Sequence, residues 1–187
     1  NLFFRVFNIK RLKDDAVTEE EIKTMITEGT EAGTIDETEQ TIINRVFHLG
    51  DRNITSLMTH RSDIIWFNLD DSEEKIKEKI TAEPHSVYPI CDGDIDEIKG
   101  VVSIKDLYVS PDNTLFKDIM SPALFVPENN TPFQVMEKFK ESKIHTCFIV
   151  DEYGSMLGMI TINDILEAIV GDVQRIHPAG GSLRRGD

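Results

Sequence analysis

The sequence predicts an α/β (α+β) fold, with two pseudosymmetric β-α-β-β-α units that pack through their sheets and follow a helical connector. Three observations carry this prediction. From residue 57 onward, short apolar runs alternate with helical segments. The same order of elements then occurs a second time. Each copy has only about 50–60 residues, too few to bury its own apolar surface well, so the two copies are expected to share a core.

The composition is typical of a folded globular chain. The 187 residues are 40% apolar and 29% charged, which is the ordinary range. A formal net charge of −14 would repel nucleic-acid phosphate and an anionic membrane surface, so no nucleic-acid partner is expected. No run approaches the ~20 apolar residues that a membrane span requires, so no direct span is expected in this fragment. Cys91 and Cys147 lie in apolar runs, which indicates buried, reduced thiols rather than a zinc or catalytic site.

Residues 14–52 are predicted to form the helical connector. Thr18 and Glu21 make a capping box, in which each side chain satisfies a free amide of the first turn. Asp36 is expected to cap a second helix that ends at Gly50.

Both ends of the chain differ from this pattern. Residues 1–13 are apolar and aromatic, which fits either the cytosolic exit of a membrane segment or a packed N-terminal arm. Residues 173–187 are typical of a flexible linker toward a further C-terminal domain.

The two units are predicted to span residues 53–110 and 114–172. In the first unit the expected elements are a strand at 64–67, a helix at 72–80 and strands at 87–91 and 98–104. In the second unit they are a strand at 125–126, a helix from Thr131, strands at 147–150 and 156–162 and a helix at 163–170.

The repeat is visible in the residues themselves. Gly100–Asp106 matches Gly158–Asp164 at an offset of 58 residues. Met58-Thr59 also matches Met120-Ser121. A duplicated unit of this kind predicts a pseudo-twofold axis, with related clefts between the copies.

The matched segments share the pattern Gly-h-h-(Ser/Thr)-h-x-Asp, where h is apolar. Its strand ends in a hydroxyl residue, and the next helical turn presents a carboxylate. The hydroxyl and the free amides of the helix N-terminus suit a phosphate oxygen, and the carboxylate suits a ribose diol. The alternative is an ordinary helix N-cap, and two copies at matching positions favour the ligand site.

The duplicated pattern resembles the CBS motif. Several longer segments of the sequence resemble more specifically the CorC/HlyC family of hemolysin-like proteins, which is related to the CNNM magnesium transporters. The phrases that carry the resemblance are Leu49–Arg52, Met58–Ile64, His85–Ile90, Asp151–Gly154 and Gly158–Thr161. The resemblance covers roughly residues 14–172 and implies a CBS (Bateman) pair.

The resemblance implies that adenosine nucleotides, AMP or ATP, bind in the clefts between the two motifs, with any Mg²⁺ carried by ATP. In this interpretation Tyr88 flanks the base, Arg61 faces phosphate and Asp164 takes the ribose hydroxyls. The main cleft would be lined by Thr59, Arg61, Ile64, Ser86, Val87, Tyr88, Pro89, Thr161 and Asp164. A second, weaker cleft would use Ser103, Asp106, Ser121, Leu124, His145 and Thr146.

Several of these residues have alternative roles. Tyr88-Pro89 could instead mark an edge strand of a sheet, where Pro, which lacks a backbone N–H, prevents a hydrogen bond to a further strand. Arg61 could pair with Asp63 or another acidic group, and His145 could be a structural histidine. The chain departs from the family pattern at His60 and Val87, which weakens the expected phosphate contacts.

The resemblance implies a regulatory module on the cytoplasmic face of the membrane, which controls an attached transmembrane domain that moves divalent cations such as Mg²⁺ or Co²⁺. A homodimer through the CBS modules is implied as well. The alternatives are a structural dimerisation module without a small-molecule ligand and an enzyme, although no catalytic triad, metal-binding His pair or Gly-rich phosphate loop is present. The acidic run Asp92–Glu97 could bind the cation, but a solvated loop is favoured because Mg²⁺ holds its waters tightly.

Overall fold

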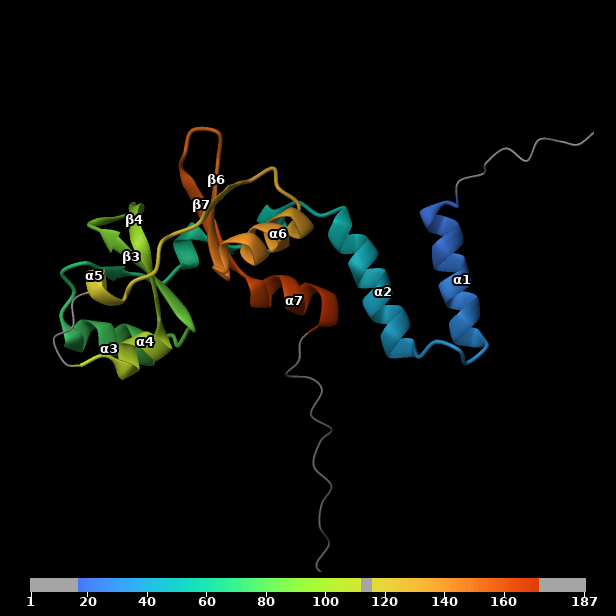
Figure 1. The fold of residues 1–187 in the computed structure, drawn as a ribbon, viewed down its shortest axis with the longest axis horizontal. Coiled ribbons are helices and arrows are strands. Elements are labelled where there is room, and N and C mark those ends of the chain that lie inside the picture. The colour runs from blue at the N-terminus through green and yellow to red at the C-terminus, as the bar shows by residue number, and fades with distance from the viewer. Residues whose placement is uncertain (1–16, 112–115, 172–187) are drawn as a thin grey trace, which may run out of the picture. The chain divides into compact units, whose positions relative to one another are not determined.

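The computed structural model describes residues 17–111 and 116–171 (Figure 1). The described chain divides into two units between Asn44 and Arg45. The predicted arm at residues 1–13 and the predicted linker at 173–187 lie outside the described residues. Within the described ranges, no helix combines the length and the apolarity needed to cross a bilayer.

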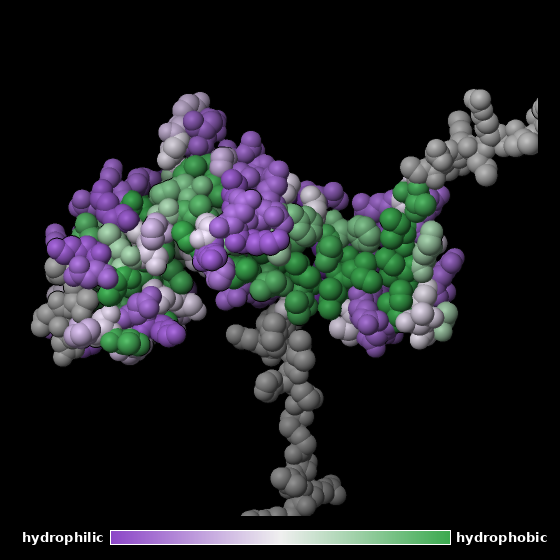
Figure 2. Space-filling view, in the orientation of Figure 1, coloured by the Kyte–Doolittle hydropathy of each residue, from purple (hydrophilic) through white to green (hydrophobic). Residues whose placement is uncertain are grey.

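The first unit consists of α1 (Glu19–Glu31) and the start of α2 (Glu37–Gly50). The predicted capping box is present, since the amide of Glu21 donates to Thr18 Oγ1 at 3.3 Å and the amide of Thr18 donates to Glu21 Oε2 at 3.0 Å. Asp36 caps α2, as predicted. Figure 2 shows apolar side chains over α1. Ile22 and Met25 of this helix are exposed, and so is Val17, which precedes it. This unit therefore presents apolar surface rather than burying it.

The second unit contains both repeats in the predicted order. The first repeat has β1 (Thr59–His60), β2 (Phe67–Asn68), α3 (Glu73–Ala82), β3 (Val87–Asp92), β4 (Asp94–Ser103) and α4 (Ile104–Val109), with short 3-10 turns η2 (Ile54–Ser56) and η3 (Arg61–Asp63). The second has α5 (Phe116–Ile119), β5 (Phe125–Pro127), α6 (Pro132–Ser142), β6 (Thr146–Val150), β7 (Met156–Thr161) and α7 (Ile162–Val170).

Two strands of the first repeat differ from the prediction. The strand expected at 64–67 begins only at Phe67, as β2 (Phe67–Asn68), because residues 64–66 form no strand after the η3 turn, which the His60 side chain caps. The strand expected at 98–104 begins earlier, at Asp94. The acidic run Asp92–Glu97 is therefore a β-hairpin rather than a loop, and it turns at Gly93, whose φ of +78° favours glycine. Most of its acidic side chains are still exposed.

The two repeats exchange short edge segments. One sheet has the order β1-β7-β6-β5, so β1 from the first repeat pairs with β7 from the second. The other sheet has the order β2-β3-β4, and Ser121 from the second repeat bridges to Val101 in β4 with hydrogen bonds of 2.8 and 2.9 Å. Each sheet is thus completed by the other repeat, which confirms the predicted pairing of the two units.

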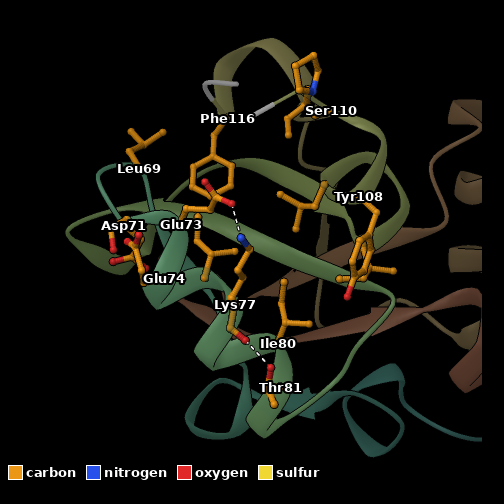
Figure 3. Close-up of a pocket in the computed structure, with 16 residues that line it drawn as sticks. Leu69, Asp71, Glu73, Glu74, Lys77, Ile80, Thr81, Tyr108, Ser110 and Phe116 are labelled. Carbon is orange, nitrogen blue, oxygen red and sulfur yellow. Dashed lines mark hydrogen bonds and ion pairs between the residues drawn. The ribbon is translucent and has the colours of Figure 1, made fainter. Parts of the chain in front are cut away.

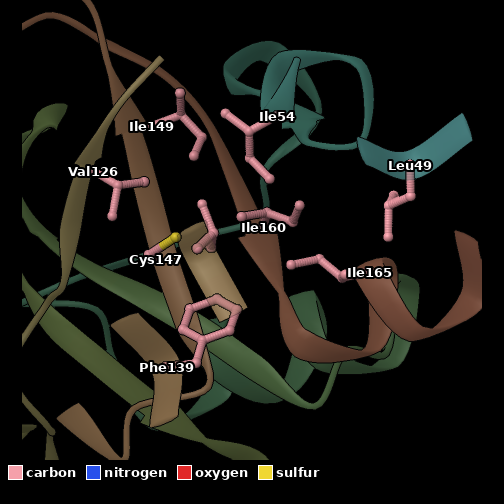
Figure 4. Packing of buried hydrophobic residues seen from close by; sticks show 9 residues of the cluster. Leu49, Ile54, Val126, Phe139, Cys147, Ile149, Ile160 and Ile165 are labelled. Carbon is pink, nitrogen blue, oxygen red and sulfur yellow. The ribbon is translucent and has the colours of Figure 1, made fainter. Parts of the chain in front are cut away.

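The buried residues form three clusters. One is centred on Phe67 and Tyr88 of the first repeat and includes Phe116 of α5. A second lies in the second repeat, where Leu49 of α2 joins Ile165 of α7 (Figure 4). The third contains Ile64, Val101, Phe148 and Met156 and so takes residues from both repeats. This third cluster is the shared core that the duplication predicts.

Pro89 lies in β3, which is the central strand of its sheet, so the edge-strand interpretation of Tyr88-Pro89 is wrong. Pro89 pairs with Val101, whose backbone groups bond to Ser121 and therefore point away from β3. On the opposite side of β3, β2 pairs only with Ile90 and Cys91. Because Pro89 has no partner on either side that needs its N–H, its lack of an N–H removes no backbone hydrogen bond between the strands.

Candidate functional site

The corner between β7 and α7 carries Thr161 and Asp164. The Asp164 Oδ2 atom accepts hydrogen bonds from the Thr161 amide at 2.6 Å and from Thr161 Oγ1 at 2.8 Å, and the Asp164 amide faces Thr161 Oγ1 at 3.4 Å. These residues form a capping box, as the N-cap interpretation predicts. The other carboxylate oxygen of Asp164, Oδ1, takes no part in these three bonds. Both side chains are partly exposed, so a ligand can approach the corner.

The matching corner between β4 and α4 carries Ser103 and Asp106. Ser103 Oγ donates to Asp106 Oδ2 at 2.6 Å, and the Asp106 amide donates to Ser103 Oγ at 3.1 Å. However, α4 has six residues whereas α7 has nine. The shorter α4 helix aligns fewer peptide dipoles behind its N-terminal amides than α7 does.

Strand pairing brings some predicted residues to the α7 corner and others to the α4 corner. Thr59 pairs with Met159, two residues before Thr161, so the first repeat contributes a hydroxyl near this end of β7. Thr146 pairs with Thr161, and the Ile162 amide donates to the His145 carbonyl oxygen at 2.9 Å. His145 and Thr146, which were expected in the second cleft, are therefore direct neighbours of the α7 corner.

The first repeat shows the same arrangement. Val87 pairs with Ser103, and the Ile104 amide donates to the Ser86 carbonyl oxygen at 2.9 Å. Ser86 and Val87 thus border the α4 corner along their own sheet. Val87 and Ile64 also contact the core cluster that both repeats share. Leu124 packs on the core of the second repeat and accepts from the Phe148 amide at 2.8 Å.

Arg61 is directed away from the α7 corner. Its Nη1 donates to the Met156 carbonyl oxygen at 3.1 Å, and its Nη2 lies 2.8 Å from Asp96 Oδ2. Met156 begins β7 and Thr161 ends it, a separation of about 16 Å for an extended strand. The alternative that Arg61 pairs with an acidic residue is confirmed, with Asp96 rather than Asp63 as the partner. The hydrogen bond with Asp96 raises the pKa of Arg61.

Tyr88 does not present its ring to a ligand. The side chain is fully buried and stacks on Phe67, with a distance of 4.6 Å between ring centroids. Its hydroxyl donates to the Glu83 carbonyl oxygen at 3.1 Å and accepts from the His85 amide at 2.8 Å. The prediction that Tyr88 flanks a base is therefore wrong in this arrangement, because every face of the ring is occupied. Pro89 is buried as well.

A cavity of about 780 Å³ lies elsewhere, between α3 and α4 of the first repeat and α5, the short helix that begins the second (Figure 3). Ile76, Ile80 and Leu107 supply apolar lining, and Lys77 pairs with Glu73 within it. None of the residues predicted for the nucleotide clefts lines this cavity. It is therefore distinct from the α7 corner, but it borders the α4 corner, because Ile104 lies between Ser103 and Asp106 and lines the cavity.

Two further features concern charge and thiols. Burial raises the pKa of Cys91 and of Cys147 to about 12, and both are free and buried, as predicted. Among the described residues, no group of three or more His, Cys, Asp or Glu side chains could hold a metal ion.

Sequence reasoning missed Asp96 as the partner of Arg61 and Arg45 as a partner of α7. Arg45 donates to the Val170 carbonyl oxygen at the end of that helix. The two pairs are separated by 35 and 125 residues along the chain. No local pattern could have found either one, because only the fold brings such distant segments together.

Comparison with known proteins gives one family match and several relatives. The model of the CBS domain matches residues 116–171. A UPF0053 protein of Synechocystis sp. is 40% identical over 172 residues, which cover 90% of this chain and 38% of that protein. The polyamine export protein of Escherichia coli K12 is 33% identical over 92% of this chain and 40% of its own length. The chain thus spans about two fifths of these relatives.

Solved structures show the same fold. The CBS domain of a bacterial CNNM/CorC family Mg²⁺ transporter is 28% identical with a TM-score of 0.75, covering 84% of this chain and 98% of that one. A structure of such a domain in complex with ATP is 26% identical with a TM-score of 0.66, over 72% and 99% of the two chains. A CBS-domain pair from Klebsiella pneumoniae with bound AMP is 27% identical with a TM-score of 0.55, over 64% and 98%.

Proposed function

Because the chain belongs to the CBS-domain family, as a tandem pair of the CNNM/CorC type, we propose that it is the regulatory module of a membrane transporter and binds an adenosine nucleotide between its two repeats. The observation that carries this proposal is the duplicated strand-to-helix corner, with Thr161 and Asp164 at the better copy. The ATP-bound and AMP-bound relatives support the choice of ligand class.

The α7 corner is the main site in this proposal. The Ile162 and Asp164 amides already donate to the His145 carbonyl oxygen and to Thr161 Oγ1, so in this proposal the Asn163 amide and the Thr161 hydroxyl bind a phosphate or ribose oxygen. Asp164 Oδ1 accepts from the ribose hydroxyls. Thr59, His145 and Thr146 complete the site by strand pairing. Ile64 and Val87 provide apolar contact for the base from the core that both repeats share. Mg²⁺, where required, enters with ATP.

Calorimetry with AMP, ADP and ATP, each with and without Mg²⁺, tests the proposal. Asp164→Asn is expected to weaken binding at least about tenfold, because it removes the charged acceptor of the ribose diol. Asp106→Asn is the matched control at the α4 corner and should weaken binding less than about threefold. If all three nucleotides fail to bind the parent chain, the module is structural and the proposal is wrong. Equal effects of the two variants would contradict the choice of corner.

The transporter partner and its cargo follow from the relatives. The module would lie on the cytoplasmic face of the membrane, attached to a transmembrane domain outside this chain. The relatives' names give two classes of cargo, Mg²⁺ and polyamines. Both are cations, and we infer a cationic cargo, because the Mg²⁺ transporter domain matches the fold over 84% of this chain and the polyamine export protein is 33% identical over 92% of it. Transport assays of the full-length protein with Mg²⁺, Co²⁺ and spermidine would distinguish these cargoes.

A homodimer is also proposed. The last helix of each repeat has exposed apolar side chains, with Tyr108 of α4 and Leu166 of α7 at matching positions and Val109 and Val170 further along the same two helices. Such side chains suit burial against a second copy of the module. Light scattering should give a dimer mass for the parent chain, and Tyr108→Ser with Leu166→Ser should give a monomer. A monomeric parent would contradict the proposed dimer.

A further inference from the structure

The two ends of α7 contact different parts of the second unit. Its N-terminus carries the capping box of Thr161 and Asp164. Its C-terminus ends at Val170, whose carbonyl oxygen accepts a hydrogen bond from Arg45 Nη1 of α2. Nine residues separate the two ends, about 13 Å at the rise of an α-helix. A short rigid helix of this length moves as one body, so a shift at one end is felt at the other.

Arg45 supplies the positive charge and the hydrogen-bond donor that the C-terminal end of α7 lacks. The last turn of α7 contains no basic residue, so its carbonyl oxygens and partial negative charge need a cation from elsewhere. The guanidinium of Arg45 meets both needs with one group. The contact is therefore favourable for electrostatic reasons and not a chance approach of two surfaces.

Gly171 makes room for this contact. Its φ of +91° lies in the region that favours glycine, and its amide closes α7 by donating to the Glu167 carbonyl oxygen at 2.7 Å. A methyl group at Gly171 would lie 2.9 Å from Arg45 Cζ. Any larger residue would thus have to displace the guanidinium.

A second contact fixes α2 against the middle of α7. Leu49 lies four residues after Arg45 and hence on the same face of α2. It is 1% exposed and shares a core cluster with the fully buried Ile165 of α7 (Figure 4). Residues 45–50 of α2 are thus held to α7 at two points, one polar and one apolar.

We propose that Arg45 is a positioning residue for the nucleotide site, and that it couples occupancy of the α7 corner to the docking of α2. This inference rests on the proposed function, since it needs a ligand at Thr161 and Asp164. Because α2 begins in the first unit and ends in the second, it is the element through which the connector would sense that ligand. Coupling between two sites is reciprocal, so breaking the Arg45 contact must also change nucleotide affinity.

Hydrogen exchange of the whole 187-residue chain, with and without saturating ATP, tests this coupling. In the parent chain, ATP is expected to slow exchange at residues 162–170 and also at 45–50. In Arg45→Gln, ATP should slow exchange at 162–170 alone, and its affinity should fall at least about fivefold. Arg45→Lys, which keeps the charge, should restore part of both effects. A merely structural role of Arg45 would leave the ATP-dependent protection of 45–50 in place.

Arg52→Ala is the matched control. Arg52 follows the same helix, but its guanidinium bonds to Ser56 within its own loop at 3.0 and 3.1 Å. This variant should behave as the parent does. Thermal melts establish that each variant is folded, and Gly171→Ala provides an independent way of displacing Arg45 if Arg45→Gln does not fold.

Three outcomes are distinguishable. Loss of ATP-dependent protection at 45–50 in Arg45→Gln, but not in Arg52→Ala, supports the coupling. Unchanged protection and affinity in Arg45→Gln overturn it while leaving the proposed function intact. Absence of nucleotide binding in the parent chain overturns the proposed function, and the coupling fails with it.

Discussion

Gly158 lies directly against the carbonyl oxygen of Thr59, so closely that a β-carbon on Gly158 would overlap it, and Met58 Sδ as well. Gly100 has the same relationship to Ser121 and Met120 in the other repeat, where a β-carbon would lie 2.7 Å from the Ser121 carbonyl oxygen. Each repeated motif begins with a glycine, Gly100 or Gly158. At this glycine, the edge segment of the other repeat passes directly against the strand. The repeats interlock at these two points.

Gly158→Ala is therefore expected to destabilise the fold by about 1–3 kcal/mol, since the obstructing atom is backbone and cannot rotate away. Gly100→Ala should have a similar effect. Urea unfolding measures both. Gly50→Ala is the control, because the nearest atom to a new β-carbon there is Phe133 Cε2 at 3.5 Å, an ordinary contact. Equal stability of Gly158→Ala and Gly50→Ala would show that the crossing is looser than described.

Tyr88→Phe tests the corrected role of Tyr88. The change removes the hydroxyl that joins the Glu83 carbonyl oxygen to the His85 amide, and we expect a loss of about 1–2 kcal/mol in the free energy of unfolding. Nucleotide affinity should stay within twofold of the parent, because the buried ring has no ligand face. Calorimetry that shows a large loss of affinity with unchanged stability would restore the original prediction.

Asp96→Asn tests whether the pairing of Arg61 opposes phosphate binding. The two side chains are 35% and 47% exposed, so the pair is screened by water and its loss should leave the unfolding midpoint unchanged. If Arg61 can turn toward a phosphate, the variant frees it, and ATP should bind several-fold more tightly. Asp92→Asn is the control, since Asp92 lies 3.8 Å from Lys99 instead. Identical ATP affinity in the parent and both variants would remove Arg61 from the site.

Asp71 makes stability depend on acid pH. Burial of this carboxylate, whose side chain is 3% exposed, acts to raise its pKa, but hydrogen bonds from Lys75, Lys79 and the Asn68 amide outweigh burial and lower the pKa to about 2. A lowered pKa in the folded state stabilises the fold above the ordinary value of 3.8, and this stability is lost as pH falls from there toward 2.

The loss should amount to about 2 kcal/mol for a shift of this size. Unfolding in urea between pH 2 and pH 5 measures it. Asp71→Asn should be less stable than the parent at pH 5 and should show a flatter pH profile, whereas Asp70→Asn, with an exposed side chain, should follow the parent. A parent profile that does not fall below pH 4 would contradict the role of Asp71.

Local pattern was enough to predict the capping box at Thr18 and to raise an N-cap at Thr161 as the alternative to a ligand site, because a capping box joins residues three apart and is complete within one turn. The same holds for Pro132 in the first turn of α6. The start of β2 was misplaced, since the apolar residues 64–66 look like a strand in the sequence but form none in the structure. Burial of Ile64 in the shared core explains that apolar run.

The sequence by itself determined the duplicated architecture, the two strand-to-helix corners and the family, because these depend on periodicity and on motifs that repeat within the chain. Only the tertiary structure decided that Tyr88 is a core residue, that Asp96 holds Arg61, and that Arg45 reaches the end of α7. The physical reason is that burial and ion pairing depend on which segments, distant in the sequence, pack against each other. Folding sets that through the packing of the two sheets, and no window of neighbouring residues encodes it.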